Sequence, residues 1–488
     1  MQFTIRLIAI ADDGAQVVHD VVTVERTALQ PETLGLSLAE GKAILSGLQT
    51  LVVERQVADH LESERRCPAC GKARRRKGTH PLHFRTIFGP QTLTSPRLRH
   101  CPCQGQQQRT FSPLAALLPE RTSPELTYLA TKWAALASYG LTTKLLQDVL
   151  PLDTGLHPEM VRRQVQRVAE RAEQALGSEH PSFIPGGQCD RDDLPIPDGP
   201  LTVGLDGGYV RGRRKQGWFE VIAGKSVLAF RRDDPDDAVA SAKCFGFVHT
   251  IDPAPKRRLF ELLTSQGMQA NQQLTFVTDG GDTVRALPAL LHPNAEHLLD
   301  WFHVAMRLTV MGQYAKGLAT TSSAAPVGDD EAGEGGPGGI TTQAEVARQL
   351  ASIKWYLWHG NVPDALDEIQ DLAWRCDVVA ETTPSARKLA KALAEFAGYI
   401  ENNRTAIPNY GERYRNGEAI SSAIAESAVN QVVSKRMVKK QQMQWTPRGA
   451  HLLLQTRTRV LNGELEATFR DWYPAFRPEA ADQAQAAA

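Results

Sequence analysis

Two stretches of this chain end in the same way, with an aspartate followed by two glycines. Residues 201–208 read LTVGLDGG and residues 274–281 read LTFVTDGG, so each is a short apolar run that closes on an acid. A third acid, Glu426, lies far downstream in SAIAESAVNQVV, a pattern typical of a helix. Two aspartates at strand ends and a glutamate on a packed helix can hold two Mg²⁺ or Mn²⁺ ions about 3.5–4 Å apart. These residues therefore indicate metal-dependent chemistry on the phosphodiester bonds of nucleic acid.

Either aspartate alone would be interpreted as an ordinary turn residue, because Asp-Gly is among the commonest turn pairs. The repeated context of Asp206 and Asp279 favours a site, since the glycines let a metal or a nucleic-acid backbone approach closely. Asp282 competes with Asp279, but its position after the glycines is typical of a helix N-cap. We therefore predict Asp206, Asp279 and Glu426 as the catalytic metal ligands.

Further polar residues accompany these acids. Asp300 and His303 in LLDWFHVAMRL are three residues apart and would share a helix face, where they could support a metal ligand or contact phosphate. Equally, the aspartate could cap the helix and the histidine could be structural. Asn430 lies on the predicted helix face of Glu426 and is a supporting candidate. The basic end of that helix predicts either phosphate binding or a solvated helix terminus, and consists of Lys435, Arg436, Lys439 and Lys440.

Four of the seven cysteines form two close pairs. Cys67 and Cys70 make a CxxC motif, and Cys101 and Cys103 make a CxC motif thirty residues later. Two such pairs can supply four thiolates to a structural Zn²⁺. Histidines at 80, 83 and 100 are near enough in sequence to replace one thiolate, so the ligand set stays open.

Basic residues surround these cysteines and recur in the following helical segment. Residues 65–109 carry eleven Lys or Arg and no acid, which predicts a field that attracts phosphate. The segment 124–176 has helical spacing, and its last helix suits a helix-turn-helix reader as well as a plain helical bundle. The predicted DNA contacts in these regions are Arg74, Arg75, Arg76, Lys77, Arg162, Arg163 and Arg167.

The bulk composition sets wide limits on the class of protein. The chain has 488 residues, 42% of them hydrophobic, which is enough for several domains with a sizeable core. Lys plus Arg and Asp plus Glu both number 55, so the net charge excludes no partner. No apolar run is long enough to predict a membrane span, and the first residues do not resemble a signal peptide. The cysteine pattern favours a reduced compartment, so we expect a cytoplasmic protein.

Shifts in pattern along the chain predict its organisation. We expect a β-hairpin and helix (1–63), a zinc ribbon (64–112), a helical DNA-binding region (113–180), a linker (181–200), the first part of a strand-and-helix core (201–303), a helical insertion (304–415) with a disordered loop (319–340), a further part of the core with the Glu426 helix (416–460), and a C-terminal tail (461–488).

Together these motifs resemble bacterial DDE insertion-sequence transposases. The likeness is strongest to the ISKra-type family and more distant to the ISL-type and Mutator-like groups. It is carried by LDGGYVRGRR, FVTDGG, LLDWFHVAMRL and SAIAESAVNQVVSKRM…QMQW. The pair Asp300 and His303 resembles the "C/D-x-x-H" element of the Mutator-like groups. The resemblance implies an α/β ribonuclease-H-like catalytic core with an all-helical insertion, preceded by a zinc ribbon and a helix-turn-helix-like region.

The resemblance also implies an activity and partners. A DDE transposase cuts and rejoins DNA with Mg²⁺ or Mn²⁺, binds the terminal repeats of its element and the target DNA, and works as a homo-oligomer in a synaptic complex. Two alternatives stay open. One is a nuclease or resolvase of the same fold without strand transfer, and the other is a non-catalytic zinc protein that binds and regulates DNA.

Overall fold

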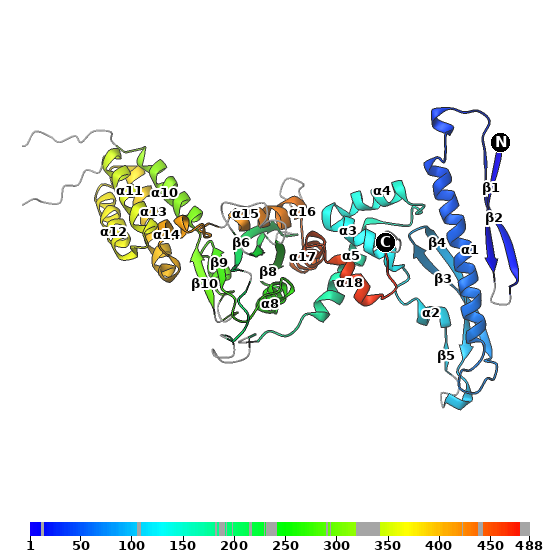
Figure 1. The fold of residues 1–488 in the computed structure, drawn as a ribbon. Coiled ribbons are helices and arrows are strands. Elements are labelled where there is room, and N and C mark those ends of the chain that lie inside the picture. The colour runs from blue at the N-terminus through cyan, green and yellow to red at the C-terminus, as the bar shows by residue number, and fades with distance from the viewer. Residues whose placement is uncertain are drawn as a thin grey trace, which may run out of the picture. The chain divides into compact units, whose positions relative to one another are not determined.

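The computed structural model describes residues 1–10, 14–104, 109–180, 183–184, 191, 193–197, 199–213, 217–228, 230, 242–288, 291–292, 294–318, 342–421, 423–437 and 443–478. The chain folds as two compact units. The first comprises Met1–Ala172 and Gly463–Ala488, and the second comprises Glu173–Asn462 (Figure 1). Within the described ranges, no helix combines the length and the apolar character needed to cross a membrane.

The first unit begins with an antiparallel hairpin of β1 (Gln2–Ile10) and β2 (Gln16–Glu25). After the 3-10 turn η1 (Pro31–Thr33), the long helix α1 (Leu38–Glu64) runs alongside this hairpin (Figure 1). The helix begins at a capping box in which Ser37 and Glu40 exchange hydrogen bonds with each other's backbone N–H groups. Arg26 fastens the hairpin to this cap, because its guanidinium lies 2.7 Å from the Glu40 carboxylate.

A second sheet follows α1. It consists of β3 (Arg76–Thr86), β4 (Gly89–Arg99) and β5 (Thr110–Phe111), which pair antiparallel in that order. The turn η2 (Pro102–Gln104) precedes β5, and the short helix α2 (Pro113–Leu117) follows it. Leu82, Leu93 and Leu114 are buried together and hold this helix against the sheet.

Three helices complete the N-terminal part of the first unit: α3 (Pro124–Leu136), α4 (Tyr139–Val149) and α5 (Pro158–Ala175). The first of them ends at Leu136, and the side chain of Ser138 caps the N-terminus of α4 shortly after it.

The expected C-terminal tail contains another helix, α18 (Leu465–Trp472). The buried ring of Phe469 packs against Tyr128 of α3 with ring centroids 5.4 Å apart, so α18 belongs to the core of the first unit. The Ala- and Gln-rich end of the chain at 479–488 lies outside the described residues.

The second unit is built on a five-stranded mixed sheet of β6 (Leu201–Arg211), β7 (Trp218–Leu228), β8 (Lys243–Val248), β9 (Leu274–Thr278) and β10 (Ala295–Leu299). The spatial order is β10-β9-β6-β7-β8. The strand β7 is antiparallel to both of its neighbours, whereas β6, β9 and β10 are mutually parallel. Parallel neighbours present their carboxyl ends at the same edge of a sheet.

Helices cover both faces of this sheet. On one face α8 (Pro255–Ser265) and α9 (Asp282–Arg285) enclose an apolar core that includes Leu205, Leu259 and Phe276. The helices on the other face are α15 (Ala423–Val429), α16 (Lys435–Met437) and α17 (Pro447–Leu461), with the π-helical turn η4 (Asn430–Ser434) between the first two. A Cβ on Gly208 of β6 would lie 3.2 Å from the Val429 side chain, so α15 lies directly over β6.

A helical body is inserted between β10 and α15. It contains α10 (Trp301–Ala315), α11 (Gln343–Trp358), α12 (Val362–Val378), α13 (Pro384–Asn402), the turn η3 (Arg404–Ala406) and α14 (Tyr410–Arg415) (Figure 1). Its own core includes Met311, Ile353 and Phe396. These helices occupy the segment where we expected a helical insertion, and the expected disordered loop lies outside the described residues.

Two elements of the second unit differ from the sequence prediction. The strand predicted to stop at Asp206 continues to Arg211, because β7 pairs with it along its whole length as far as Trp218. The helix expected to begin at the Asp282 N-cap has only the four residues of α9 in the described part of the chain. Pro288 accounts for its short length, because proline clashes with the preceding helical turn.

Candidate functional site

Asp206 lies within β6, the strand between antiparallel β7 and parallel β9, in a sheet that helices cover on both faces. It is on the same face of the sheet as Gly208, over which α15 packs. The backbone N–H of Gly207 donates a 2.7 Å hydrogen bond to its carboxylate. The side chain is half-buried, so much of its hydration shell has been lost.

Asp279 comes directly after β9, beside Asp206. Leu205 and Thr278 are partners in the parallel register, so the residues that follow them are next to each other across about 4.8 Å of sheet. The Asp279 carboxylate accepts a 2.9 Å hydrogen bond from the backbone N–H of Gly281. The prediction that these two aspartates lie on neighbouring strands is therefore confirmed.

Gly280 makes this turn possible. Its φ of +78° is in the left-handed region, and an added Cβ would lie only 2.6 Å from the Leu299 side chain and 2.8 Å from that of Asn403. The competing acid Asp282 points elsewhere, since its carboxylate is 89% exposed and pairs with Arg285 at 2.6 Å. It is the first residue of α9 and not the predicted N-cap, which is Gly281.

Asp300 follows β10, the third parallel strand, and is fully buried. It caps α10 by accepting a 2.8 Å hydrogen bond from the N–H of Phe302, and its own N–H donates to the Thr278 carbonyl at 2.8 Å. Its carboxylate also lies 3.6 Å from Nε2 of His303. Asp300 therefore caps the helix, as the structural interpretation predicted, and it also contacts His303.

The neighbouring charged residues together shift the pKa of Asp206. Desolvation, together with repulsion from Asp279 and to a smaller extent from Asp300, raises the pKa of Asp206 to about 6, although His303 and the Gly207 N–H partly oppose the shift. A half-buried carboxylate among like charges gains stability from a nearby cation. The donor set, all carboxylate oxygen, fits Mg²⁺ or Mn²⁺.

Glu426 stands on α15, one helical turn before the Val429 that covers Gly208. Its side chain is exposed, and the carboxylates of Asp206, Asp279 and Glu426 do not form a group whose ligand atoms all lie within 4.8 Å among the described residues. The helix brings Glu426 to the face of the sheet that carries Asp206, but the three acids are not drawn into close contact.

A regular helix would also place Val433 and Met437 on the face of Glu426 and Asn430, but the structure does not. Val433 and Met437 are buried, whereas Glu426 and Asn430 are exposed. The cause is the π-helical turn η4, which widens the helix after Glu426 and shifts the following side chains out of register. The buried Arg457 of α17 supports this turn, because its guanidinium donates to the carbonyls of Gln431 and Val432.

Two residues near the acids were not identified from the sequence. Tyr399 of α13 donates a 2.8 Å hydrogen bond from its hydroxyl to the backbone carbonyl of Asp279. Arg307 of α10 lies over the Tyr399 ring, with its guanidinium carbon 4.1 Å from the ring centroid. Arg307 could have been identified from its i+4 spacing from His303. No sequence pattern pointed to Tyr399, because it lies 120 residues from Asp279.

The four paired cysteines form a candidate metal centre at the end of the β3–β4 hairpin. Their sulfur atoms all lie within 4.8 Å of one another, with Cys67 to Cys103 at 3.5 Å and Cys70 to Cys101 at 3.4 Å. A tetrahedral zinc site with Zn–S bonds of about 2.3 Å needs sulfur atoms about 3.8 Å apart. The cysteines therefore form a complete S₄ set, with no histidine needed.

Hydrogen bonds within this cluster shift the pKa values of its thiols. The N–H groups of Ala69 and then Cys70 donate to the Cys67 sulfur and lower the pKa of its thiol to about 7, against the effect of burial. Hydrogen bonds with Cys101 and the other cysteines raise the pKa of the Cys103 thiol to about 12. Without a cation, repulsion prevents four thiols in contact from all ionising. Bound Zn²⁺ would favour the thiolate form of each.

A second group of potential metal ligands is already neutralised by a buried arginine. Glu173, Asp252 and His451 lie together in the second unit, but the buried Arg258 pairs with Glu173 at 2.8 Å and with Asp252 at 2.7 Å. Burial opposes the ionisation of Glu173, yet hydrogen bonds from His451 and Arg258 outweigh it and lower its pKa to about 2. This cluster is a structural ion network.

The basic residues predicted near the cysteines divide into two groups. Arg74 is a structural residue, because its largely buried side chain pairs with Glu64 at 2.6 Å and lies over the Phe111 ring; its prediction as a DNA contact is not supported. The side chains of the next three basic residues are exposed: Arg75, Arg76 and Lys77.

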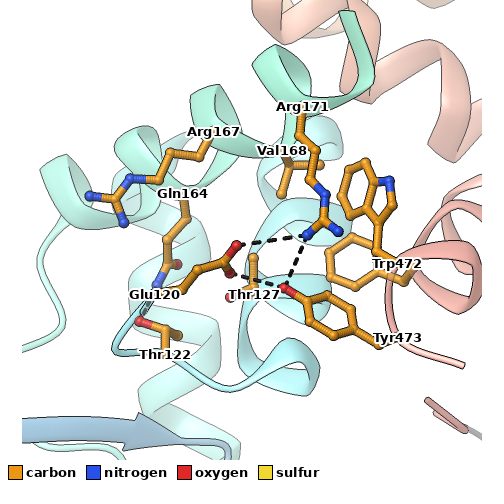
Figure 2. A pocket seen from close by; sticks show the side chains of 10 residues that line it. Glu120, Thr122, Thr127, Gln164, Arg167, Val168, Arg171, Trp472 and Tyr473 are labelled. Carbon is orange, nitrogen blue, oxygen red and sulfur yellow. Dashed lines mark hydrogen bonds and ion pairs between the residues drawn. The ribbon is translucent and has the colours of Figure 1, made fainter. Parts of the chain in front are cut away.

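Helix α5 presents part of its predicted basic surface. Arg162 and Arg163 are both engaged by Glu159, whereas Arg167 is exposed. Arg167 also lines a small pocket together with Arg171, whose guanidinium lies 4.3 Å over the Trp472 ring and pairs with Glu120 at 3.8 Å. Figure 2 shows Arg167 extending away from this pair. Arg167 is thus exposed although it lines the same pocket as Trp472 of α18.

The basic end after Glu426 is smaller than predicted. Lys435 is exposed, but Arg436 is buried and lies over the Trp445 ring at 5.3 Å, so it is not presented at the surface as a DNA contact. Lys439 and Lys440 lie outside the described residues.

Comparison with known proteins adds no relative. No family model matches the chain, and no curated protein matches it.

Proposed function

We propose that this chain is a metal-dependent DNA transposase with a ribonuclease-H-like core. The observation that carries the proposal is the meeting of Asp206, Asp279 and Asp300 at three neighbouring parallel strands, where like charge and burial raise the pKa of Asp206 to about 6. The strand order, with the second strand antiparallel, and helices on both faces support the proposed fold.

In this proposal, Asp206, Asp279 and Glu426 hold divalent metal ions. Bound Mg²⁺ or Mn²⁺ would activate water or a DNA 3′-hydroxyl for attack and stabilise the leaving oxygen. Asp279 is fixed by the turn at Gly280 and by the Tyr399 hydroxyl on its carbonyl. Glu426 lies on a helix above β6, over the face of the sheet that carries Asp206.

Asp300 and His303 support this site in our proposal. The buried Asp300 accepts from the first turn of α10 and orients His303, whose positive charge, when protonated, favours the ionised form of Asp206. Neither residue needs to bind metal for this role. Asn430, exposed at the start of the π turn, is a candidate for contact with DNA near Glu426.

The first unit supplies DNA binding in the proposal. Zn²⁺ held by the four cysteines would stabilise the β3–β5 sheet as a zinc ribbon, which carries exposed Arg75, Arg76 and Lys77. Helix α5 presents Arg167 for contact with the terminal repeats. A transposase joins two DNA ends, so we propose a homo-oligomer in the nucleoid of a bacterial cytoplasm.

A strand-transfer assay tests the proposal. The full-length protein is incubated with Mg²⁺ and a supercoiled plasmid carrying the DNA that flanks its reading frame. We expect nicked and joined products, and we expect Asp206→Asn, Asp279→Asn and Glu426→Gln each to abolish them while Asp282→Asn does not. Cleavage without joining would indicate the nuclease or resolvase alternative. Zinc-dependent DNA binding by a wild type that never cuts would indicate the regulator.

A further inference from the structure

Helix α10 carries a polar stripe that leads away from the carboxylate site. Asp300 caps the helix, His303 is one turn further, and Arg307 is one turn beyond His303, so the three share one side of the helix. Arg307 is exposed. Among the residues that the structure describes, no carboxylate forms an ion pair with it.

The Arg307 guanidinium has a fixed support. Its central carbon lies 4.1 Å from the centroid of the Tyr399 ring, and the hydroxyl of the same ring donates a 2.8 Å hydrogen bond to the Asp279 carbonyl. One aromatic side chain thus connects the guanidinium to the backbone of a predicted metal ligand. Contact with the ring restrains a long, flexible side chain, and the guanidinium has further N–H groups that can bind an anion.

The charge of the site explains the need for such a cation. Three carboxylates at neighbouring strands repel the phosphates of an approaching nucleic-acid strand. A guanidinium one helical turn from His303 would attract a phosphate to the edge of this cluster. Its planar fork matches two phosphate oxygens, which an ammonium group matches less well.

We propose that Arg307, stacked on Tyr399, binds a backbone phosphate of the DNA strand that enters the carboxylate site. The inference rests on the proposed function, because it names the contact that places the DNA strand beside Asp279. Arg307 would act by binding and orienting the strand and would exchange no proton.

The test compares full-length wild type with Arg307→Ala and Arg307→Lys. The matched control is Arg348→Ala, which removes an exposed arginine from α11 in the same helical body. Affinity for a 40-base-pair duplex is measured against salt concentration with Ca²⁺ in place of Mg²⁺, and plasmid nicking is measured with Mg²⁺. Thermal unfolding of each variant checks its fold.

Loss of one phosphate contact should lower the slope of log affinity against log salt by about 0.9 in Arg307→Ala. Its nicking rate should fall about 10- to 100-fold, as for the loss of a charged hydrogen bond. Arg307→Lys should keep the salt slope of the wild type but nick at an intermediate rate, because it retains the charge and loses the fork. Arg348→Ala should match the wild type in both measurements.

Two negative results have different meanings. If the wild type nicks DNA and Arg307→Ala has the same salt slope and rate as Arg348→Ala, Arg307 does not bind phosphate and the proposed function stands. If the wild type neither binds DNA with a salt-dependent affinity nor nicks it with Mg²⁺, the proposed function fails, and the role of Arg307 fails with it.

Discussion

Replacing Asp206 with asparagine is expected to stabilise the metal-free protein at neutral pH. The carboxylate is half-buried and faces the charges of Asp279 and Asp300, which together with desolvation raise its pKa from 3.8 to about 6. Asparagine has a similar shape, can still accept the hydrogen bond from the Gly207 N–H, and carries no charge. The substitution therefore removes an unfavourable charge and leaves the local contacts in place.

The pKa of Asp206 sets the magnitude and the pH range of this effect. Because the folded state holds the Asp206 proton more tightly than the unfolded state, the stability of the wild type falls as pH rises from about 4 to about 6. At about 1.36 kcal/mol per pH unit, the difference between the two pKa values corresponds to at most about 3 kcal/mol. Partial solvation reduces it, and we expect Asp206→Asn to be about 1–2 kcal/mol more stable at pH 7.5 and equal to the wild type at pH 4.

Urea unfolding with EDTA across pH 4–8 measures this difference, and repeating it with Mg²⁺ tests the metal site. A cation at a hundredfold excess over its Kd would stabilise the wild type by about 2.7 kcal/mol. The variant should gain little. The control Asp282→Asn changes a carboxylate that is 89% exposed and should alter stability by less than about 0.5 kcal/mol at every pH.

The reasoning is refuted if Asp206→Asn is no more stable than the wild type at pH 7.5 without metal. It is also refuted if the advantage does not depend on pH between 4 and 6. Equal stabilisation of both proteins by Mg²⁺ would refute the assignment of Asp206 as a metal ligand and leave the electrostatic argument intact.

Three further predictions concern the residues that support the two proposed metal sites. Purified protein should contain about one zinc ion per chain by elemental analysis. The Cys101→Ser variant should lose the zinc and bind DNA more weakly. Wild type without zinc would contradict the zinc site. Gly280→Ala should lower the free energy of unfolding by at least about 2 kcal/mol because of its positive φ and the nearby Leu299 and Asn403 side chains, whereas Gly281→Ala should be mild; equal effects would contradict it. Arg457→Met should lower the free energy of unfolding by about 1–3 kcal/mol, because it leaves the carbonyls of the π turn without a hydrogen-bond donor. It should also reduce the thermal shift caused by Mg²⁺. An unchanged shift would show that the turn does not support the metal site.

The sequence predicted the pairing of Asp206 and Asp279 because both signals were local. An apolar run predicts a buried strand, and the Asp-Gly-Gly that follows it predicts a backbone that a metal or a nucleic-acid backbone can approach closely. Parallel pairing then follows from the helix between the strands, and the register places the two acids side by side. Asp300 could be placed for the same reason, since it follows the next strand and begins a helix.

The errors occurred where burial or helix geometry depends on distant residues. Arg74 and Arg436 belong to basic runs that suggested solvent-exposed surfaces, yet Phe111 and Trp445 cover them with aromatic rings. The π turn after Glu426 could not be predicted from its local sequence. Its carbonyls find a donor in Arg457, a residue of another helix.

The hydrogen bonds of the three acids indicate where a cation is needed most. Asp300 is buried, but it accepts from Phe302 in the first turn of α10, where the helix dipole also favours a negative charge. Asp279 accepts from the Gly281 N–H in a turn that follows the strand. Asp206 lies within its strand, so its neighbours' N–H groups are largely committed to the sheet, and Gly207 is its one donor among the described residues. The uncompensated charge is therefore concentrated on Asp206, and a divalent ion bound there would offset the electrostatic cost of bringing all three carboxylates together.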